Sequence, residues 1–149
     1  MKKIVLLTVL TFAVGILSAQ LNLGADYYLL GDYTAAKTYF EKSMSSNAGE
    51  SNFYLGEIAF KEGNVAAAKS FYDSGLATDP ANPYNQIGLL KLQIKGGDIK
   101  ALDKQFAAIQ KTAKKDVNVA IAIARAYLDN NKIAEAAAKL EAAKKINKK

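Results

Sequence analysis

The 149-residue chain contains no cysteine, no histidine and no tryptophan, and only two prolines. Without cysteine or histidine it cannot form a disulfide framework, a Cys/His zinc site, a cysteine nucleophile or a histidine-dependent catalytic triad. A metal would need oxygen ligands, and the sequence has no Asp-rich calcium loop, so we expect no metal and no cofactor. The content of 50% hydrophobic and 23% charged residues is that of a folded chain of about one domain. Together these features favour a binding protein over an enzyme.

The longest apolar run lies at the N-terminus. Two lysines precede an apolar stretch over residues 4–17, and the small residues Ser18 and Ala19 follow it. This order is typical of a secretory signal peptide, and a mainly apolar stretch of 14 residues is shorter than the roughly 20 residues of a membrane-spanning helix. We therefore predict a signal peptide over residues 1–19 and a periplasmic or secreted location in a bacterial cell envelope. An uncleaved N-terminal anchor is the alternative, because Leu17 departs from the small residue expected before the cleavage site.

Charges of opposite sign are concentrated in different halves of the chain. Residues 20–89 contain four lysines and eight Asp or Glu, whereas residues 90–149 contain fourteen Lys or Arg and six Asp or Glu. Such segregation creates a field that steers charged partners, although lysines on a helix surface commonly serve only to keep it solvated. Two functions stay open on this ground: binding of the basic half to an anionic surface, and self-association of acidic and basic halves. No recognisable reading motif accompanies the lysines, and we expect no nucleic-acid partner.

An internal repeat with a period of 32–34 residues explains most of the chain. Five positions recur in four copies: a turn residue, an apolar residue, a mostly small residue, a mostly aromatic residue and a final small or apolar residue. In that order they are Gly31, Gly63, Gly97 and Asn131; Tyr33, Val65, Ile99 and Ile133; Ala36, Ala68, Leu102 and Ala136; Phe40, Tyr72, Phe106 and Leu140; Ser43, Gly75, Ile109 and Ala143. A period of this length is typical of stacked helical hairpins.

Each copy reads as two helices joined by a tight turn, because apolar residues recur at helical spacing on both sides of it. We predict left-handed backbone at the turn residue of all four copies, a conformation that glycine and asparagine tolerate best. The next residue is predicted to cap the second helix in three copies (Asp32, Asn64 and Asp98), but Lys132 cannot do so in the fourth. The expected helices are residues 20–30, 33–46, 49–62, 65–78, 83–95, 98–112, 117–130 and 133–147.

The pattern resembles the tetratricopeptide repeat family. The matching residues are Gly24, Tyr27, Gly31, Ala36 and Phe40 in the first copy; Gly56, Gly63, Ala68, Tyr72 and Pro80 in the second; Gly97 and Phe106 in the third; and Ala124, Tyr127, Ala136 and Ala143 in the fourth. The resemblance implies an all-α fold, a right-handed α-solenoid of four helix-turn-helix repeats. It places one domain at residues 20–149, with repeats at about 20–48, 49–82, 83–116 and 117–149. An ordinary helical bundle is the alternative, but a bundle requires no recurring turn glycine.

In that family, ligands lie in a concave groove lined by the first helix of each repeat. Carried onto this chain, the groove positions give a partner-binding set of Tyr28, Phe53, Glu57, Phe60, Tyr84, Ile87, Lys91, Ile94, Lys95, Ile121, Arg125 and Leu128. Aromatic anchors with a cationic edge suit a protein or peptide partner that carries apolar side chains and carboxylates. The predicted function is therefore an exported, non-catalytic scaffold for protein–protein interaction. Each aromatic residue has packing between helices as its alternative role.

Two further readings come from particular residues. Glu50 and Glu57 lie seven residues apart, about 10.5 Å along a helix, which is near the spacing of a glycan-cleaving carboxylate pair. Any solvated helix offers the same spacing, so an enzyme is the weaker hypothesis.

Repeat arrays normally end in a polar helix that covers the last apolar face. The sequence shows none after Ile146, so the lysine-rich final helix covers that face itself, or the face is a docking site, or the chain is part of a longer one.

Overall fold

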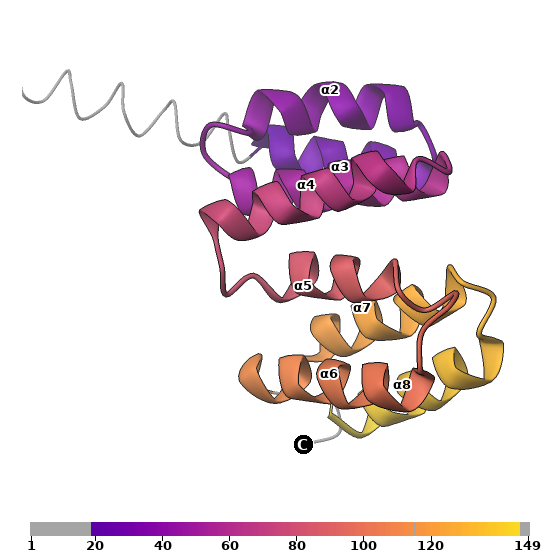
Figure 1. Cartoon of the computed structure of the whole chain (residues 1–149). Coiled ribbons are helices and arrows are strands. Elements are labelled where there is room, and N and C mark those ends of the chain that lie inside the picture. The colour runs from indigo at the N-terminus through magenta and orange to yellow at the C-terminus, as the bar shows by residue number, and fades with distance from the viewer. Residues whose placement is uncertain (1–18, 115, 147–149) are drawn as a thin grey trace, which may run out of the picture. The chain divides into compact units, whose positions relative to one another are not determined.

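A computed structural model describes residues 19–114 and 116–146, and within these ranges the chain is helical between turns, with no strand (Figure 1). A first helix covers residues 19–30 of the described part. The others are α2 (Tyr33–Ser43), α3 (Ala48–Lys61), α4 (Val65–Thr78), α5 (Pro83–Lys91), α6 (Ile99–Thr112), α7 (Val117–Leu128) and α8 (Ile133–Ile146). The predicted all-α class is confirmed. The predicted signal segment lies outside the described residues, except for Ala19.

The predicted left-handed turn is present in the first, second and fourth hairpins, and the predicted side-chain cap is present in the first, second and third. Gly31, Gly63 and Asn131 have φ angles of 81°, 80° and 59°, in the left-handed region. In the first hairpin the Asp32 carboxylate accepts a hydrogen bond from the amide of Ala35 at 3.0 Å. In the second and third hairpins, Asn64 Oδ1 accepts a hydrogen bond from the amide of Ala67 at 3.0 Å, and Asp98 Oδ1 accepts one from the amide of Lys100 at 2.9 Å. Left-handed turn residues and side-chain caps thus define where the second helices start.

The third turn departs from the prediction in two ways. Gly97 does not have a positive φ angle, so the left-handed conformation predicted there is wrong. A glycine is needed at this position because there is no space for a side chain: an added Cβ would lie 2.6 Å from the carbonyl oxygen of Gln93. In addition, α5 ends at Lys91 rather than at residue 95, because the amides of Gln93 and Ile94 bond to carbonyls three residues back. Hydrogen bonds over three residues, instead of four, end the α-helix, and the chain then continues through turns to α6.

The chain divides into two compact units, one ending at Thr78 and one starting at Asp79. The division falls close to the predicted boundary between the second and third repeats, while the single domain over residues 20–149 stays a prediction. No helix in the described part of the chain has the length and apolarity needed to cross a bilayer. Each unit contains two hairpins and has its own hydrophobic core.

In the first unit, aromatic rings fill the space between the two hairpins. The fully buried Phe40 ring stacks on the ring of Tyr54, with centroids 4.6 Å apart and planes 3° from parallel. Phe40 also lies against Gly24, where an added Cβ would be 2.7 Å from the ring. Gly56 has the same relation to Tyr72 in the second hairpin. The glycine on the first helix of each hairpin therefore makes room for the aromatic residue of the second helix.

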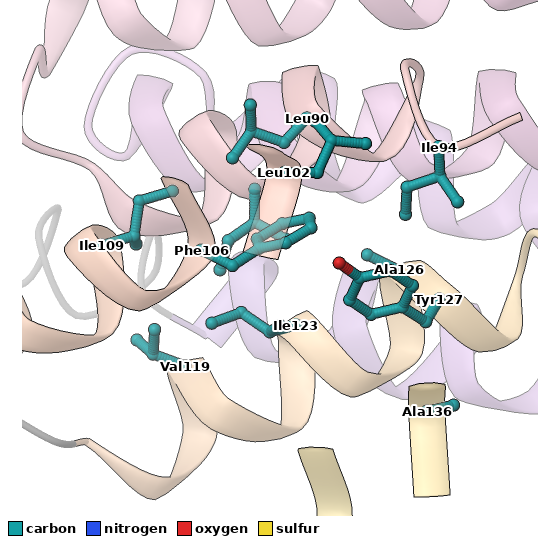
Figure 2. Close-up of a cluster of buried hydrophobic side chains, with 11 residues drawn as sticks. Leu90, Ile94, Leu102, Phe106, Ile109, Val119, Ile123, Ala126, Tyr127 and Ala136 are labelled. Carbon is teal, nitrogen blue, oxygen red and sulfur yellow. The ribbon is translucent and has the colours of Figure 1, made fainter. Parts of the chain in front are cut away.

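In the second unit, aliphatic residues of α5, α6 and α7 surround two aromatic rings (Figure 2). The rings of Phe106 and Tyr127 meet edge to face with centroids 5.3 Å apart. Ile94 and Leu102 pack in the same cluster and are 1% and 2% exposed. This core fixes α7 against α5 and so positions the candidate residues at the ends of both helices.

Candidate functional site

Two of the four predicted site residues in the first unit are buried. Tyr28 is 6% exposed, and its ring lies 5.4 Å from that of Tyr54. Glu57 is 4% exposed, and its carboxylate accepts a hydrogen bond from the Tyr72 hydroxyl at 2.6 Å. Burial of this carboxylate beside a tyrosine gives Glu57 a packing role within the hairpin, which leaves no exposed pair with Glu50.

Phe53 and Phe60 are half-buried and lie seven residues apart on α3, so they share one side of that helix. The Phe53 ring contacts the rings of Tyr54 and Tyr72, at centroid distances of 5.2 and 6.4 Å. One side of each phenylalanine therefore packs inward while the other reaches the surface. These two residues are the accessible part of the predicted aromatic stripe in the first unit.

In the second unit, three predicted site residues on and just after α5 are buried. Ile87 and Ile94 are 2% and 1% exposed and belong to the core cluster. Lys91 lies between them in sequence, is 2% exposed, and has its ammonium 3.4 Å from the Asp129 carboxylate. The Lys91 carbonyl also accepts a hydrogen bond from the Asn130 side chain at 3.1 Å. Lys91 thus ties the end of α5 to the end of α7, and Ile87 and Ile94 contribute to the core.

The remaining residues of the set reach the surface of the second unit. Tyr84 is half-buried against the core, and Lys95 is exposed in the turn after α5. On α7, Ile121, Arg125 and Leu128 are all exposed and follow one another at spacings of four and three residues. That spacing places them on one side of the helix. The structure therefore brings together a cation and two large aliphatic side chains on α7.

Two features at these helices were missed in the sequence. One is the buried Lys91–Asp129 pair. The sequence could have indicated it, because Lys91 lies four residues after Ile87 and three before Ile94, a spacing that places Lys91 on the core side of α5. The other is an apolar hollow of about 190 Å³ between α6, α7 and α8. Small side chains at Ala107, Ala120 and Ala142 line it, and alanine periodicity alone did not distinguish a hollow from close helix packing.

A polar cluster beside this hollow joins α6, α7 and α8. The Asp103 carboxylate accepts a hydrogen bond from the Tyr127 hydroxyl at 2.6 Å and lies 2.8 Å from the Lys139 ammonium. Partial burial raises the pKa of Asp103, but the hydrogen bonds from Lys139 and Tyr127 and the Lys139 charge outweigh it, so the pKa is lowered overall. Burial and the same carboxylate raise the pKa of Tyr127. The cluster links the last hairpin to α6.

The lowered pKa of Asp103 predicts an acid-dependent contribution to stability. The folded state binds the proton less readily than the unfolded state, so the contribution is present above the ordinary pKa of aspartate and is lost as pH falls through the lowered value. We expect Asp103→Asn to lower the free energy of unfolding at neutral pH by less than about 1 kcal/mol, because the side chain is 42% exposed. Denaturant unfolding at neutral and acid pH should show this difference shrinking in acid; an equal difference at both pH values would contradict the assignment.

Comparison with known proteins agrees with this architecture. A search of curated proteins found no match to the chain. Residues 21–83 match the family model described as Tetratricopeptide repeat, a range that covers the first two hairpins and the start of α5. No three Asp, Glu, His or Cys side chains converge on a metal-sized site anywhere in residues 19–114 or 116–146. The match, with the left-handed turns at Gly31 and Gly63, shows that residues 21–83 are similar to tetratricopeptide repeats.

Proposed function

We propose that this chain is an exported, non-catalytic scaffold that holds a protein or peptide partner. The observation that carries the proposal is the exposed row of Ile121, Arg125 and Leu128 on the first helix of a tetratricopeptide-like hairpin. Tetratricopeptide repeats generally mediate protein–protein interaction and are typically non-catalytic. The signal-like sequence before residue 20 supports a place in a bacterial cell envelope, periplasmic or secreted.

The chemistry of the accessible residues defines the partner. Arg125 and Lys95 supply cations at the surface of the second unit, and Ile121 and Leu128 supply apolar area. Large apolar side chains provide affinity when they become fully desolvated, while charges at the rim steer encounter and fix orientation. A segment that combines apolar side chains with carboxylates fits both features. In the first unit, Phe53 and Phe60 offer aromatic area to the same kind of partner.

The test is capture of partners from an envelope extract, using charge reversal at the candidate site. The variant Lys95→Glu/Arg125→Glu is expected to lose the captured partner, because both side chains are exposed and both would then repel carboxylates. The matched control is Lys104→Glu/Lys111→Glu, which makes the same change in net charge at two exposed lysines of α6. Lys91 is left unchanged because it is buried. Equal retention by the site variant and the wild type would reject this surface, and crosslinking with mass spectrometry would identify a retained partner.

The charge of the second unit favours one alternative function, binding to anionic lipid headgroups or wall polymers. Residues 79–149 contain fourteen Lys or Arg and seven Asp or Glu. Binding of this type depends on total charge and weakens steeply as salt rises. The two charge-reversal variants separate the hypotheses: an anionic surface would release both equally, whereas a shaped partner site would release only Lys95→Glu/Arg125→Glu.

A further inference from the structure

In each unit, one set of repeat positions on the earlier hairpin is covered by the hairpin that follows. In the first hairpin the set is Leu21, Tyr28, Tyr33 and Phe40, which pack in a cluster with Leu55 and Ile58 of α3. In the third hairpin the equivalent set is Ile87, Ile94, Ile99 and Phe106, which pack in a cluster with Val119 and Ile123 of α7. The same four positions therefore form the contact between successive hairpins in both units.

The fourth hairpin carries large aliphatic residues at these positions, yet all four are exposed. They are Ile121, Leu128, Ile133 and Leu140, with exposed fractions of 40%, 50%, 61% and 43%. The first two are seven residues apart on α7 and the last two seven apart on α8, so each pair lies on one side of its helix. We call these four residues the end face. The equivalent residues of the third hairpin belong to one cluster, and an exposed apolar surface built from such positions marks an interaction site.

The first hairpin has the complementary surface. The residues that receive the preceding hairpin include Leu55 in the second hairpin and Ile123 and Tyr127 in the fourth, all at most 4% exposed. The equivalent residues of the first hairpin are Leu23, which is 42% exposed, and Tyr27, whose ring stacks on Tyr39 of α2 at 5.3 Å. Leu30, at 80% exposure, lies seven residues after Leu23 on the same side of the helix. We call Leu23, Tyr27 and Leu30 the front face.

We propose that the end face of one copy binds the front face of a second copy, so that the fourth hairpin stacks on a first hairpin as hairpins stack within each unit. Charge favours this pairing: residues 19–78 contain seven Asp or Glu and four Lys, whereas residues 79–149 have an excess of seven basic residues. Contact between the two different units brings opposite charges together, while contact between like units would bring like charges together.

When two copies bind through one end face and one front face, the pair still has one free front face and one free end face. Further copies can therefore add, and the assembly grows as an open chain unless the rotation between copies closes a ring. The inference deepens the proposed function, because it gives Ile121 and Leu128 a defined occupant. Arg125 lies between Ile121 and Leu128 on α7, so the two proposals are separated at the front face, which the envelope partner does not use. A variant blocked at the front face keeps both cations and should still capture the envelope partner.

The experiment uses two variants of the full chain, each blocked at one face. Leu128→Asp/Leu140→Asp removes the end face, and Leu23→Asp/Leu30→Asp removes the front face; all four side chains are exposed, so the fold is expected to persist. In analytical ultracentrifugation, the wild type should show a mass that rises with concentration above the 16.0 kDa of one chain. Each variant alone should remain at one chain. An equimolar mixture should form a complex of two chains and nothing larger, because one intact front face and one intact end face remain.

The matched control is Leu29→Asp. Leu29 is 70% exposed and adjacent to Leu30, but it points to a different side of the same helix and should associate like the wild type. Circular dichroism checks that every variant keeps its helix content. Three results would overturn the proposal: a monomeric wild type at all concentrations, a mixture that forms no two-chain complex, or equal loss of association in the Leu29→Asp control.

Discussion

Replacement of Gly56 by alanine is expected to lower the free energy of unfolding by about 1–3 kcal/mol. An added Cβ would lie 2.4, 2.7 and 2.9 Å from three ring atoms of Tyr72. The ring has little room to move, because Tyr72 is fully buried and its hydroxyl is bonded to Glu57 at 2.6 Å. Elsewhere in a helix, alanine is more favourable than glycine by up to about 1 kcal/mol, so a loss of stability identifies the contact as its cause. Denaturant unfolding followed by circular dichroism measures the change.

Gly96→Ala is the matched control for this substitution. No atom lies within 4 Å of its added Cβ and its backbone is not left-handed, so stability should stay constant or rise by up to about 1 kcal/mol. A second check is the double variant Gly56→Ala/Tyr72→Leu, in which the smaller side chain relieves the contact. Its cost should be less than the sum of the two single costs. Additive costs would mean that the glycine serves something other than the Tyr72 ring.

The same contact explains why the repeat could be predicted from the sequence. A small residue on the first helix, an aromatic residue on the second and a turn residue between them have a fixed spacing, because each depends on the position of the others. Gly56, Gly63 and Tyr72 follow this rule, and so do Gly24, Gly31 and Phe40. Turns and caps depend on residues that are close in the sequence, so they can be predicted from it. The left-handed turns at Gly31 and Gly63 and the caps at Asp32 and Asn64 are confirmed. The right-handed superhelical stacking of successive hairpins stays a prediction.

The conformation of the third turn was harder to predict from the sequence, because it depends on the atoms around Gly97. Gly97 has the same register as Gly31, but its neighbour is the Gln93 carbonyl and its backbone is not left-handed. A repeat pattern gives the position of a glycine without saying whether handedness or space requires it. The third turn is also the one where the family pattern is weakest, with Leu102 in place of a small residue. Its side chain lies 3.1 Å from a Cβ added at Gly97.

The candidate site was predicted by position in the repeat, and position alone does not determine exposure. Ile94 and Leu128 occupy equivalent places, yet Ile94 is 1% exposed and Leu128 is 50% exposed. The difference arises because a fourth hairpin covers the third within the same unit, while no described residue covers the fourth. The sequence supplies the same aliphatic chemistry at both positions. Which of them is available to a partner depends on the neighbour, and the partner-binding role of the set stays a prediction.

The buried ammonium of Lys91 gives the second prediction with a large effect. We expect Asp129→Asn to lower the free energy of unfolding by about 3 kcal/mol, because it removes the negative charge 3.4 Å from an ammonium that is 2% exposed. A charge excluded from water depends on its counterion much more than a solvated charge does. The matched control is Asp73→Asn, which breaks a shorter ion pair with Lys69, at 2.6 Å. Those side chains are 48% and 63% exposed, and the expected loss is below about 0.5 kcal/mol.

A double variant separates the loss of a favourable pair from the cost of leaving one charge buried. Lys91→Met keeps most of the side-chain volume and removes the ammonium, so Lys91→Met/Asp129→Asn should be more stable than Asp129→Asn alone. If the single variant lost no more stability than Asp73→Asn, the ammonium would have adequate solvation without Asp129, and the pair would not hold α5 to α7. If the double variant were the less stable of the two, the methylene stem and remaining contacts of Lys91 would matter more than its charge. Lys91 is the last residue of α5 and lies between the core residues Ile87 and Ile94 in the sequence. Either result therefore also measures how firmly the third hairpin is attached to the fourth, whose outer side carries the end face.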